Sequence, residues 1–398
     1  MRELHMRRTN RIVPTYTGDV SGACSALFEL GGMVVIHDPS GCNSTYNTHD
    51  ETRWYDQDSL IFITGLVERD AILGNDDKLV RDVVEAAREL RPRFIALCNS
   101  PIPFISGTDF RAICRLVERE TGIPCFYVRT NGMHDYVVGA GNAFCGIAER
   151  FCGPQEVRPG TLNILGATPL DLGLAGSDAS LRAFVEAAGF EVVSCWAMGS
   201  SLDELSRAAE AQVNLVTSAT GLSVARLLRE RFGTPYVVGM PLGTTPEDPL
   251  GAPWARALAD SLRKAAETGE CAWPCRDLRG EPSPGACAVV GEGVFAGSLA
   301  CALEHELGEA VQVVCPLEGS TEVLAPSDLP VEGEEGVEEA LAGKGLVVAD
   351  ELYRPVLGRD ARLCSLPHQA LSGRNGWRVA QDPVWLDPVG LVGDDRER

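Results

Sequence analysis

The sequence lacks several features that would assign a protein class at once. No apolar run reaches the roughly 18 residues that a membrane-spanning helix needs. The 14 cysteines include no Cys-x-x-Cys pair, and no Gly-x-x-x-x-Gly-Lys-Ser/Thr loop for ATP phosphates occurs. Basic residues are outnumbered, at 35 against 56 acidic ones, which gives a net charge of −21. Because such a chain repels phosphate groups, we expect neither nucleic acid nor a membrane as a partner.

The expected cellular compartment limits the roles that the 14 cysteines can have. Residues 1–10 are polar and have no apolar core behind their basic side chains, so they do not resemble a signal peptide. We therefore expect a cytoplasmic protein, in which disulfides are rare. The cysteines are then metal ligands, redox thiols or core residues, and burial as a small apolar residue is the simplest interpretation of any single one.

The chain is too long for one hydrophobic core. It has 398 residues, of which 45% are hydrophobic and 23% are charged, as in ordinary globular proteins. Short β-branched runs alternate with longer amphipathic stretches, a pattern that predicts parallel α/β sheets. Pro- and Gly-rich segments at 152–160 and 280–285 divide the chain. We expect three domains, at 1–155, 156–283 and 284–398.

The expected elements follow from this alternation. The expected strands are 33–37, 94–98, 124–128, 161–165, 191–195, 212–217, 235–238, 286–290, 311–315 and 346–349. The expected helices are 76–90, 108–121, 136–151, 177–188, 201–211, 221–232, 254–268 and 297–307. The acidic stretch 318–336, which is rich in Pro and Gly, is expected to be a solvated loop.

Three cysteines stand out by their place in this pattern. Open parallel sheets bind ligands beyond the carboxyl ends of their strands. Cys42 follows one strand closely, and Cys98 ends another, before two prolines that predict an open loop. Cys24 lies in a small-residue stretch that predicts a turn, and glycine in such turns lets a backbone approach a bulky inorganic group. Since thiolates are the ligands of iron–sulfur clusters, these three are candidate cluster ligands.

The same residues carry a family resemblance. His37-Asp-Pro-Ser-Gly-Cys42 is similar to the His-Gly-Pro-x-Gly-Cys motif of the nitrogenase molybdenum–iron protein superfamily, and Cys24 lies at the distance of its upstream Gly-Cys turn. The segments 70–79 and 96–109 resemble that family's Asp-Ile-Val-Phe-Gly-Gly-x-x-Lys-Leu and Ser-Glu-Cys-Pro-x-x-x-Ile-Gly-Asp-Asp segments. A weaker likeness continues through the third block.

The resemblance implies an α/β protein with three Rossmann-like parallel-sheet domains of the nitrogenase component 1 type. It implies an iron–sulfur cluster on Cys24, Cys42 and Cys98 at a subunit interface. The cluster would have four irons, as in the related reductases of protochlorophyllide and Ni-sirohydrochlorin, or be a larger one of the P-cluster kind. It also implies a homodimer or a heterodimer with a homologous subunit, and an ATP-dependent iron–sulfur reductase as the electron donor.

Departures from the family narrow the expected function. Ser218 stands where nitrogenase has a cofactor-binding cysteine, and a hydroxyl is a poor ligand for a soft metal. The candidate for the family's late histidine ligand is His368. We therefore expect no molybdenum cofactor, and both residues become candidates for the cleft between domains. Further candidates for the surroundings of the cluster or for a substrate cleft are His37, Asn43, Tyr46 and His49.

Three functions remain open from the sequence. The first is a nitrogenase-like oxidoreductase that takes electrons from the reductase through its cluster and reduces an unidentified, organic substrate. The second is a scaffold on which an iron–sulfur cluster or another metal cofactor is assembled. The third is a nicotinamide-dependent enzyme with structural thiols, for which the stretch Gly291–Gly297 is the support. Its Gly-x-Gly-x-x-x-Gly pattern is one residue longer than the dinucleotide fingerprint.

Overall fold

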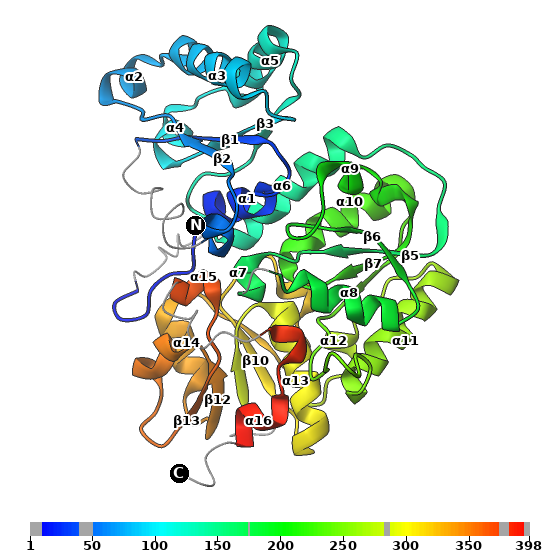
Figure 1. Cartoon of the computed structure of the whole chain (residues 1–398). Coiled ribbons are helices and arrows are strands. Elements are labelled where there is room, and N and C mark those ends of the chain that lie inside the picture. The colour runs from blue at the N-terminus through cyan, green and yellow to red at the C-terminus, as the bar shows by residue number, and fades with distance from the viewer. Residues whose placement is uncertain (1–9, 40–50, 174–175, 282–286, 374–381, 394–398) are drawn as a thin grey trace, which may run out of the picture.

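Three parallel sheets organise the chain (Figure 1). The computed structural model describes residues 10–39, 51–173, 176–281, 287–373 and 382–393. Each block of the sequence forms one sheet, and every strand pairing within the three sheets is parallel. This confirms the predicted α/β class with three parallel-sheet units.

The strands of each sheet have the following bounds. The first sheet, in the order β2-β1-β3-β4, contains β1 (Met33–His37), β2 (Leu60–Ile63), β3 (Ile95–Asn99) and β4 (Cys125–Val128). The second, in the order β6-β5-β7-β8, contains β5 (Arg158–Leu165), β6 (Glu191–Cys195), β7 (Ala211–Val216) and β8 (Tyr236–Val238). The third, in the order β11-β10-β9-β12-β13, contains β9 (Ala288–Val290), β10 (Gln312–Cys315), β11 (Leu329–Pro330), β12 (Leu346–Ala349) and β13 (Arg362–Ser365).

The helices connect these strands in the alternating manner of parallel sheets. Those of the first block are α1 (Asp19–Leu27), α2 (Glu68–Leu73), α3 (Asp76–Leu90), α4 (Pro101–Ser106), α5 (Phe110–Thr121) and α6 (Tyr136–Phe151). Those of the second are α7 (Pro169–Leu172), α8 (Asp178–Ala187), α9 (Leu202–Ser206), α10 (Leu222–Phe232), α11 (Pro253–Thr268) and α12 (Pro274–Asp277). Those of the third are α13 (Gly293–Leu307), α14 (Gly333–Leu341), α15 (Gln369–Ser372) and α16 (Pro388–Gly393).

One apolar core joins the three sheets. The largest cluster of buried apolar residues includes Leu27 beside the first sheet, Phe184 beside the second and Val289 within the third. Helices α1 and α6 lie between the first sheet and the other two (Figure 1). All residues of α1 are buried, so this helix lies in the interior of the molecule. Among the described residues, no helix has both the length and the apolar character to cross a bilayer.

Three local expectations are wrong. Pro101 does not open a loop but begins α4, because proline at the first helical position lacks only an N–H that would have no partner there. Cys24 lies within helix α1 and not in a turn. The stretch 318–336 is not simply a solvated loop, since Glu334 is buried and its Oε2 accepts the backbone N–H groups of residues 11, 12 and 13 at 2.9, 2.6 and 2.8 Å.

Glycines explain why α1 can lie so deep. A Cβ at Gly22 would lie 2.0 Å from the carbonyl oxygen of Tyr136, and a Cβ at Gly139 would lie 1.7 Å from that of Asp19. The backbones of α1 and α6 therefore touch at these two positions. We had expected the glycine before Cys24 to let an inorganic group approach the backbone. Gly22 instead lets helices α1 and α6 come into contact.

Gly139→Ala should destabilise the protein by roughly 3 kcal/mol or more, because the added methyl group meets a backbone oxygen that cannot move aside. Denaturant-induced unfolding measures this change. Gly153→Ala is the matched control, since no heavy atom lies within 4 Å of its new Cβ. Equal unfolding midpoints for the two variants would contradict the close helix contact.

Candidate functional site

Cys24 and Cys98 lie together although they are far apart in the sequence. Cys24 lies in α1 and Cys98 near the carboxyl end of β3, and both are fully buried in the same cluster. A hydrogen bond between the two thiols, together with burial and the nearby Glu51, raises the pKa of the Cys24 thiol well above its ordinary value. The raised pKa favours the protonated thiol of Cys24 without a metal, and metal binding to this thiol would release a proton.

The third predicted ligand, Cys42, lies outside the described residues, as do Asn43, Tyr46 and His49. The chain on both sides of this segment ends near the thiol pair. On one side, β1 pairs with β3 so that Ile36 lies opposite Cys98. On the other side, Glu51 is close enough to Cys24 to influence its pKa.

The donor set present fits an iron–sulfur cluster. Two adjacent thiols in a dry, apolar interior are the ligand type that such clusters use, and Cys42 would be the third. Within the described ranges, no group of three or more His, Cys, Asp or Glu side chains could hold a metal ion. A cluster at this place thus depends on the ligand that the segment 40–50 contributes.

Arg53 connects the cysteine-bearing helix to the end of this segment. Its buried guanidinium donates from Nε to Glu51 Oε1 at 2.7 Å and from Nη2 to Glu51 Oε2 at 3.0 Å. Nη2 also donates to the carbonyl oxygen of Ser25, the residue after Cys24, at 2.7 Å. Nη1 donates to Glu29 Oε1 and to the carbonyl oxygen of Ala197, each at 2.8 Å. Arg53 therefore joins α1, the residues after position 50 and the loop that follows β6.

His37 is not part of the thiol group. Ile36 and Cys98 belong to the core on the α1 side of the sheet, whereas the His37 ring packs edge-on against Phe110 of α5, with centroids 6.0 Å apart. Its Nδ1 lies 2.8 Å from Thr64 Oγ1. Burial lowers the pKa of His37 to about 4, so the ring is neutral. The sheet separates this histidine from the cysteines.

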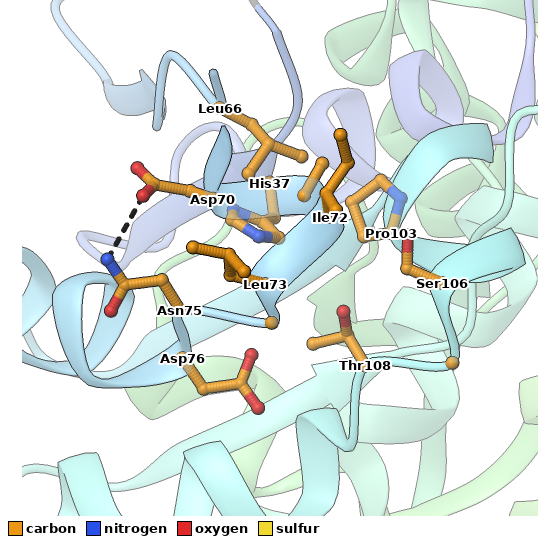
Figure 2. A pocket seen from close by; sticks show the side chains of 13 residues that line it. His37, Leu66, Asp70, Ile72, Leu73, Asn75, Asp76, Pro103, Ser106 and Thr108 are labelled. Carbon is orange, nitrogen blue, oxygen red and sulfur yellow. Dashed lines mark hydrogen bonds between the residues drawn. The ribbon is translucent and has the colours of Figure 1, made fainter. Parts of the chain in front are cut away.

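A cavity of about 230 Å³ lies on the His37 side of the sheet, between α2 and α4. In Figure 2, Ser106 and Thr108 lie across the cavity from Leu73 and Asp76. Large apolar side chains project into solvent from the same two helices. Ile72 and Leu73 on α2 are each 74% exposed, and Ile105 on α4 is 75% exposed. Such a patch is a typical mark of a protein-binding surface.

Ser218 and His368 meet at a second polar group, located where the three units join. Asp171, at the end of α7, connects them. Its Oδ2 accepts the Ser218 hydroxyl at 2.6 Å and the Thr168 hydroxyl at 2.7 Å. Its Oδ1 accepts the Tyr136 hydroxyl at 2.5 Å and lies 3.9 Å from His368 Nε2. The two residues that the sequence assigned to the interdomain cleft are therefore brought together by one carboxylate.

Glu292 adds a second acid to this polar group. It is fully buried at the start of α13, where its Oε1 accepts the N–H groups of Ala219 and Val294 and its Oε2 accepts that of Phe295. Burial and then the charge of Asp171 raise the pKa of Glu292 to about 8. Burial also lowers the pKa of His368, against the opposing effect of Asp171. The site is thus acidic, with a neutral imidazole.

Glu292 also weakens the nicotinamide alternative. A dinucleotide fingerprint binds its phosphates at the free N–H groups of a helix start. Here the carboxylate of Glu292 already accepts those N–H groups at the beginning of α13. The glycines of the stretch 291–297 serve packing instead: Gly293 lies against Ser320 and Val323, and Gly297 lies against the backbone of Cys275.

Sequence reasoning missed Asp171, Tyr136 and Glu292. Asp171 follows β5 at its carboxyl end, which is the place where parallel sheets put ligand-binding residues, and this signal could have been used. Tyr136 and Glu292 gave no such signal, because their roles depend on how the three units meet. Four further cysteines lie on or directly after helices or strands predicted from the sequence, which favours a structural role: Cys114, Cys125 and Cys152 are buried, and Cys145 is partly buried.

Comparisons with known proteins identify the family of the chain. A family model described as nitrogenase component 1 type oxidoreductase matches residues 19–347. The chain is 27% identical over 245 residues to the nitrogenase iron–molybdenum cofactor biosynthesis protein NifE of Clostridium pasteurianum, which covers 56% of this chain and 51% of that protein. It is 22% identical over 286 residues to the nitrogenase molybdenum–iron protein alpha chain of Methanosarcina barkeri, which covers 67% and 50%. The chain thus spans about half the length of these curated relatives.

A solved structure described as nitrogenase Cp1 at pH 6.5 has a similar fold, with a TM-score of 0.59 and 15% sequence identity over 92% of this chain and 86% of that one. The matched family region contains α1 with Cys24, β3 with Cys98 and the polar residues Asp171 and Glu292. It also contains nearly all strands of the three sheets. The chain belongs to the nitrogenase component 1 type oxidoreductases.

Proposed function

We propose that this chain is the cluster-binding component of a nitrogenase-like reductase. In this role it receives electrons from an ATP-dependent iron–sulfur protein and passes them through a cluster on Cys24, Cys42 and Cys98 to a substrate held between the domains. The observation that carries the proposal is the meeting of the buried Cys24 and Cys98 thiols at the carboxyl end of the first sheet. A homodimer, or a heterodimer with a homologous subunit, would enclose the cluster at its interface.

A short path through the protein favours electron transfer. Gly22, two residues before Cys24, touches the backbone of Tyr136. The Tyr136 hydroxyl in turn donates to Asp171 in the interdomain polar group. A bound cluster would supply one-electron transfer, while α1 and α6 exclude water from the region between the two sites.

The electron donor would dock on the apolar patch of α2 and α4. The patch belongs to the same end of the first sheet as the thiol pair, since Pro101 begins α4 three residues after Cys98. Its exposed members on the described helices are Ile72, Leu73, Ile102, Phe104 and Ile105.

The docking proposal predicts that Leu73→Asp and Ile105→Asp slow ATP-dependent reduction of the cluster about tenfold or more, since each removes an exposed apolar anchor. The measurement is bleaching of the cluster absorbance when a nitrogenase-type iron protein, MgATP and dithionite are added anaerobically. Leu278→Asp is the control, because Leu278 is also exposed, at 59%, but lies after α12. Reduction at an unchanged rate in both patch variants would contradict this docking surface.

The same experiment tests the proposed function. The chain purified without oxygen should contain iron and sulfide, and its cluster should be reduced only when iron protein and ATP are both present. Absence of iron, or reduction that needs no ATP, would contradict the proposal.

A scaffold for cofactor assembly is the second candidate. It is favoured by the likeness to cofactor biosynthesis proteins. A scaffold would transfer its cluster or metal cofactor to an added acceptor protein. The reductase would keep its cluster and transfer electrons repeatedly.

A further inference from the structure

A second cavity lies beside the interdomain polar group. Its volume is about 90 Å³, and residues of the second and third units line it. Asp171 and His368 form its polar side. The rest of the cavity wall is mainly apolar and includes Val289, Val290, Phe295, Leu366, Leu386 and Leu391. The cavity therefore has one acidic end and an apolar body.

The acidic end is a buried carboxyl group whose hydrogen-bond partners are neutral. The Asp171 side chain is 2% exposed. Its hydrogen-bond donors among the described residues are the neutral hydroxyls of Tyr136, Thr168 and Ser218. A carboxylate has about four acceptor positions, so one more donor can be accommodated.

The described residues provide no close basic partner for this carboxyl group. No Lys or Arg of the described chain forms an ion pair with Asp171, and the nearest basic atom is His368 Nε2 at 3.9 Å. The burial that lowers the pKa of His368 opposes a charge on that ring. Since buried carboxyl groups in proteins are normally paired or fully hydrogen-bonded, a cationic ligand would complete the partners that the described residues give to Asp171.

An unsatisfied nitrogen points to a ligand as well. His368 Nδ1 is buried and has no hydrogen-bond partner in the described protein, although the ring lines the cavity. Buried polar atoms are rarely left in this state. Asp171, which can accept one more hydrogen bond, belongs to the second unit, and His368, whose Nδ1 has no partner in the described protein, belongs to the third. Both residues line the same cavity.

Size and charge define the class of ligand. An engineered protein cavity of about 150 Å³ holds benzene, so the 90 Å³ here suits a smaller molecule. The acidic side of the cavity, at Asp171, disfavours anions. A metal ion is disfavoured because no group of three or more suitable ligands exists among the described residues.

We propose that the cavity binds a small organic cation, whose ammonium group contacts Asp171 and whose hydrocarbon part lies against the apolar wall. The role of this cation as a substrate rests on the proposed function, whereas its binding does not. Binding is therefore measured by calorimetry on the iron-loaded protein, without electron donor, using ethylammonium as the probe and ethanol and acetate as the matched neutral and anionic probes.

Ethylammonium should bind saturably and at least tenfold more tightly than ethanol or acetate, and benzylammonium should be excluded by its size. Asp171→Asn should weaken ethylammonium binding at least tenfold while the iron content stays unchanged. Asp203→Asn makes the same substitution at an exposed aspartate of α9 outside the cavity, so it should bind ethylammonium as well as the unaltered protein does.

Three results would overturn the cation site: equal binding of ethanol or acetate, tight binding of benzylammonium, or unchanged affinity in Asp171→Asn. If Asp171→Asn does not fold, the comparison of the four probes on the unaltered protein still tests whether the cavity binds a small cation. If the unaltered protein binds ethylammonium as expected but its cluster is not reduced by iron protein and ATP, only the proposed function is contradicted.

Discussion

Cys98→Ala is expected to leave the anaerobically purified protein with little or no iron, and Cys24→Ala should do the same. Both thiols are fully buried and adjacent, so each would be a direct ligand on one face of the cluster. Loss of one thiolate from a site with three protein ligands removes a bond that no neighbouring side chain of the described chain can replace. Iron and sulfide per chain, with the visible absorption spectrum, measure the effect. Cys42→Ala should behave in the same way.

Cys114→Ala is the matched control for these variants. Cys114 is equally small and only 5% exposed, and it lies on α5, on the other face of the first sheet. Its removal leaves a small cavity but touches neither thiol of the pair. The iron content should therefore stay at the level of the unaltered protein. If Cys114→Ala loses as much iron as Cys98→Ala, the assignment of the ligands is wrong.

Arg53→Met is expected to lower the free energy of unfolding by about 3–5 kcal/mol, because it leaves buried Glu51 without its charged partner. Methionine preserves much of the side-chain volume, so the loss reports mainly the broken hydrogen bonds and ion pairs. Glu51 is 2% exposed, and its pKa, which burial raises, is held below the ordinary value by the Arg53 guanidinium. Denaturant-induced unfolding measures the change.

Arg93→Met is the control for Arg53→Met. Arg93 also forms an ion pair, with Asp203, but the two side chains are 43% and 77% exposed. Exposed pairs contribute about 1 kcal/mol or less. Arg53→Met should also reduce iron loading, since Arg53 holds the chain after position 50 against the helix of Cys24. Similar unfolding midpoints for the two variants would show that the Arg53 network is not a structural anchor.

Much of the fold could be predicted because the central strands are buried on both faces. In β1 and β3 every residue is buried, and such strands appear in a sequence as uninterrupted apolar runs. The strands that were missed, β2, β11 and β13, lie at sheet edges and are partly exposed. β11 has only two residues and β13 includes polar ones, whereas β2 is a wholly apolar run of four residues that could have been predicted. The extent of helix α1 was not predicted because its glycine and serines have low helical preference, and Gly22 is required by the contact with α6.

The candidate site was predictable where it depends on the ends of strands. Cys98 could be located because it ends a strand, and the opposite orientation of His37 follows from the alternation of side chains along β1. The central position of Asp171 could not be predicted. It depends on hydroxyls of Tyr136, which begins α6 in the first unit, and Ser218, which follows β7 in the second, and these meet only when the units pack together.

The location of iron is the most direct test of the central claim. A crystal structure of the anaerobic protein, with anomalous diffraction measured at the iron edge, would place the metal without reference to any activity. The account predicts iron atoms bonded to the sulfur atoms of Cys24, Cys42 and Cys98 between α1 and the carboxyl ends of β1 and β3. Iron bound elsewhere, with the Cys24 and Cys98 thiols still paired only with each other, would contradict it.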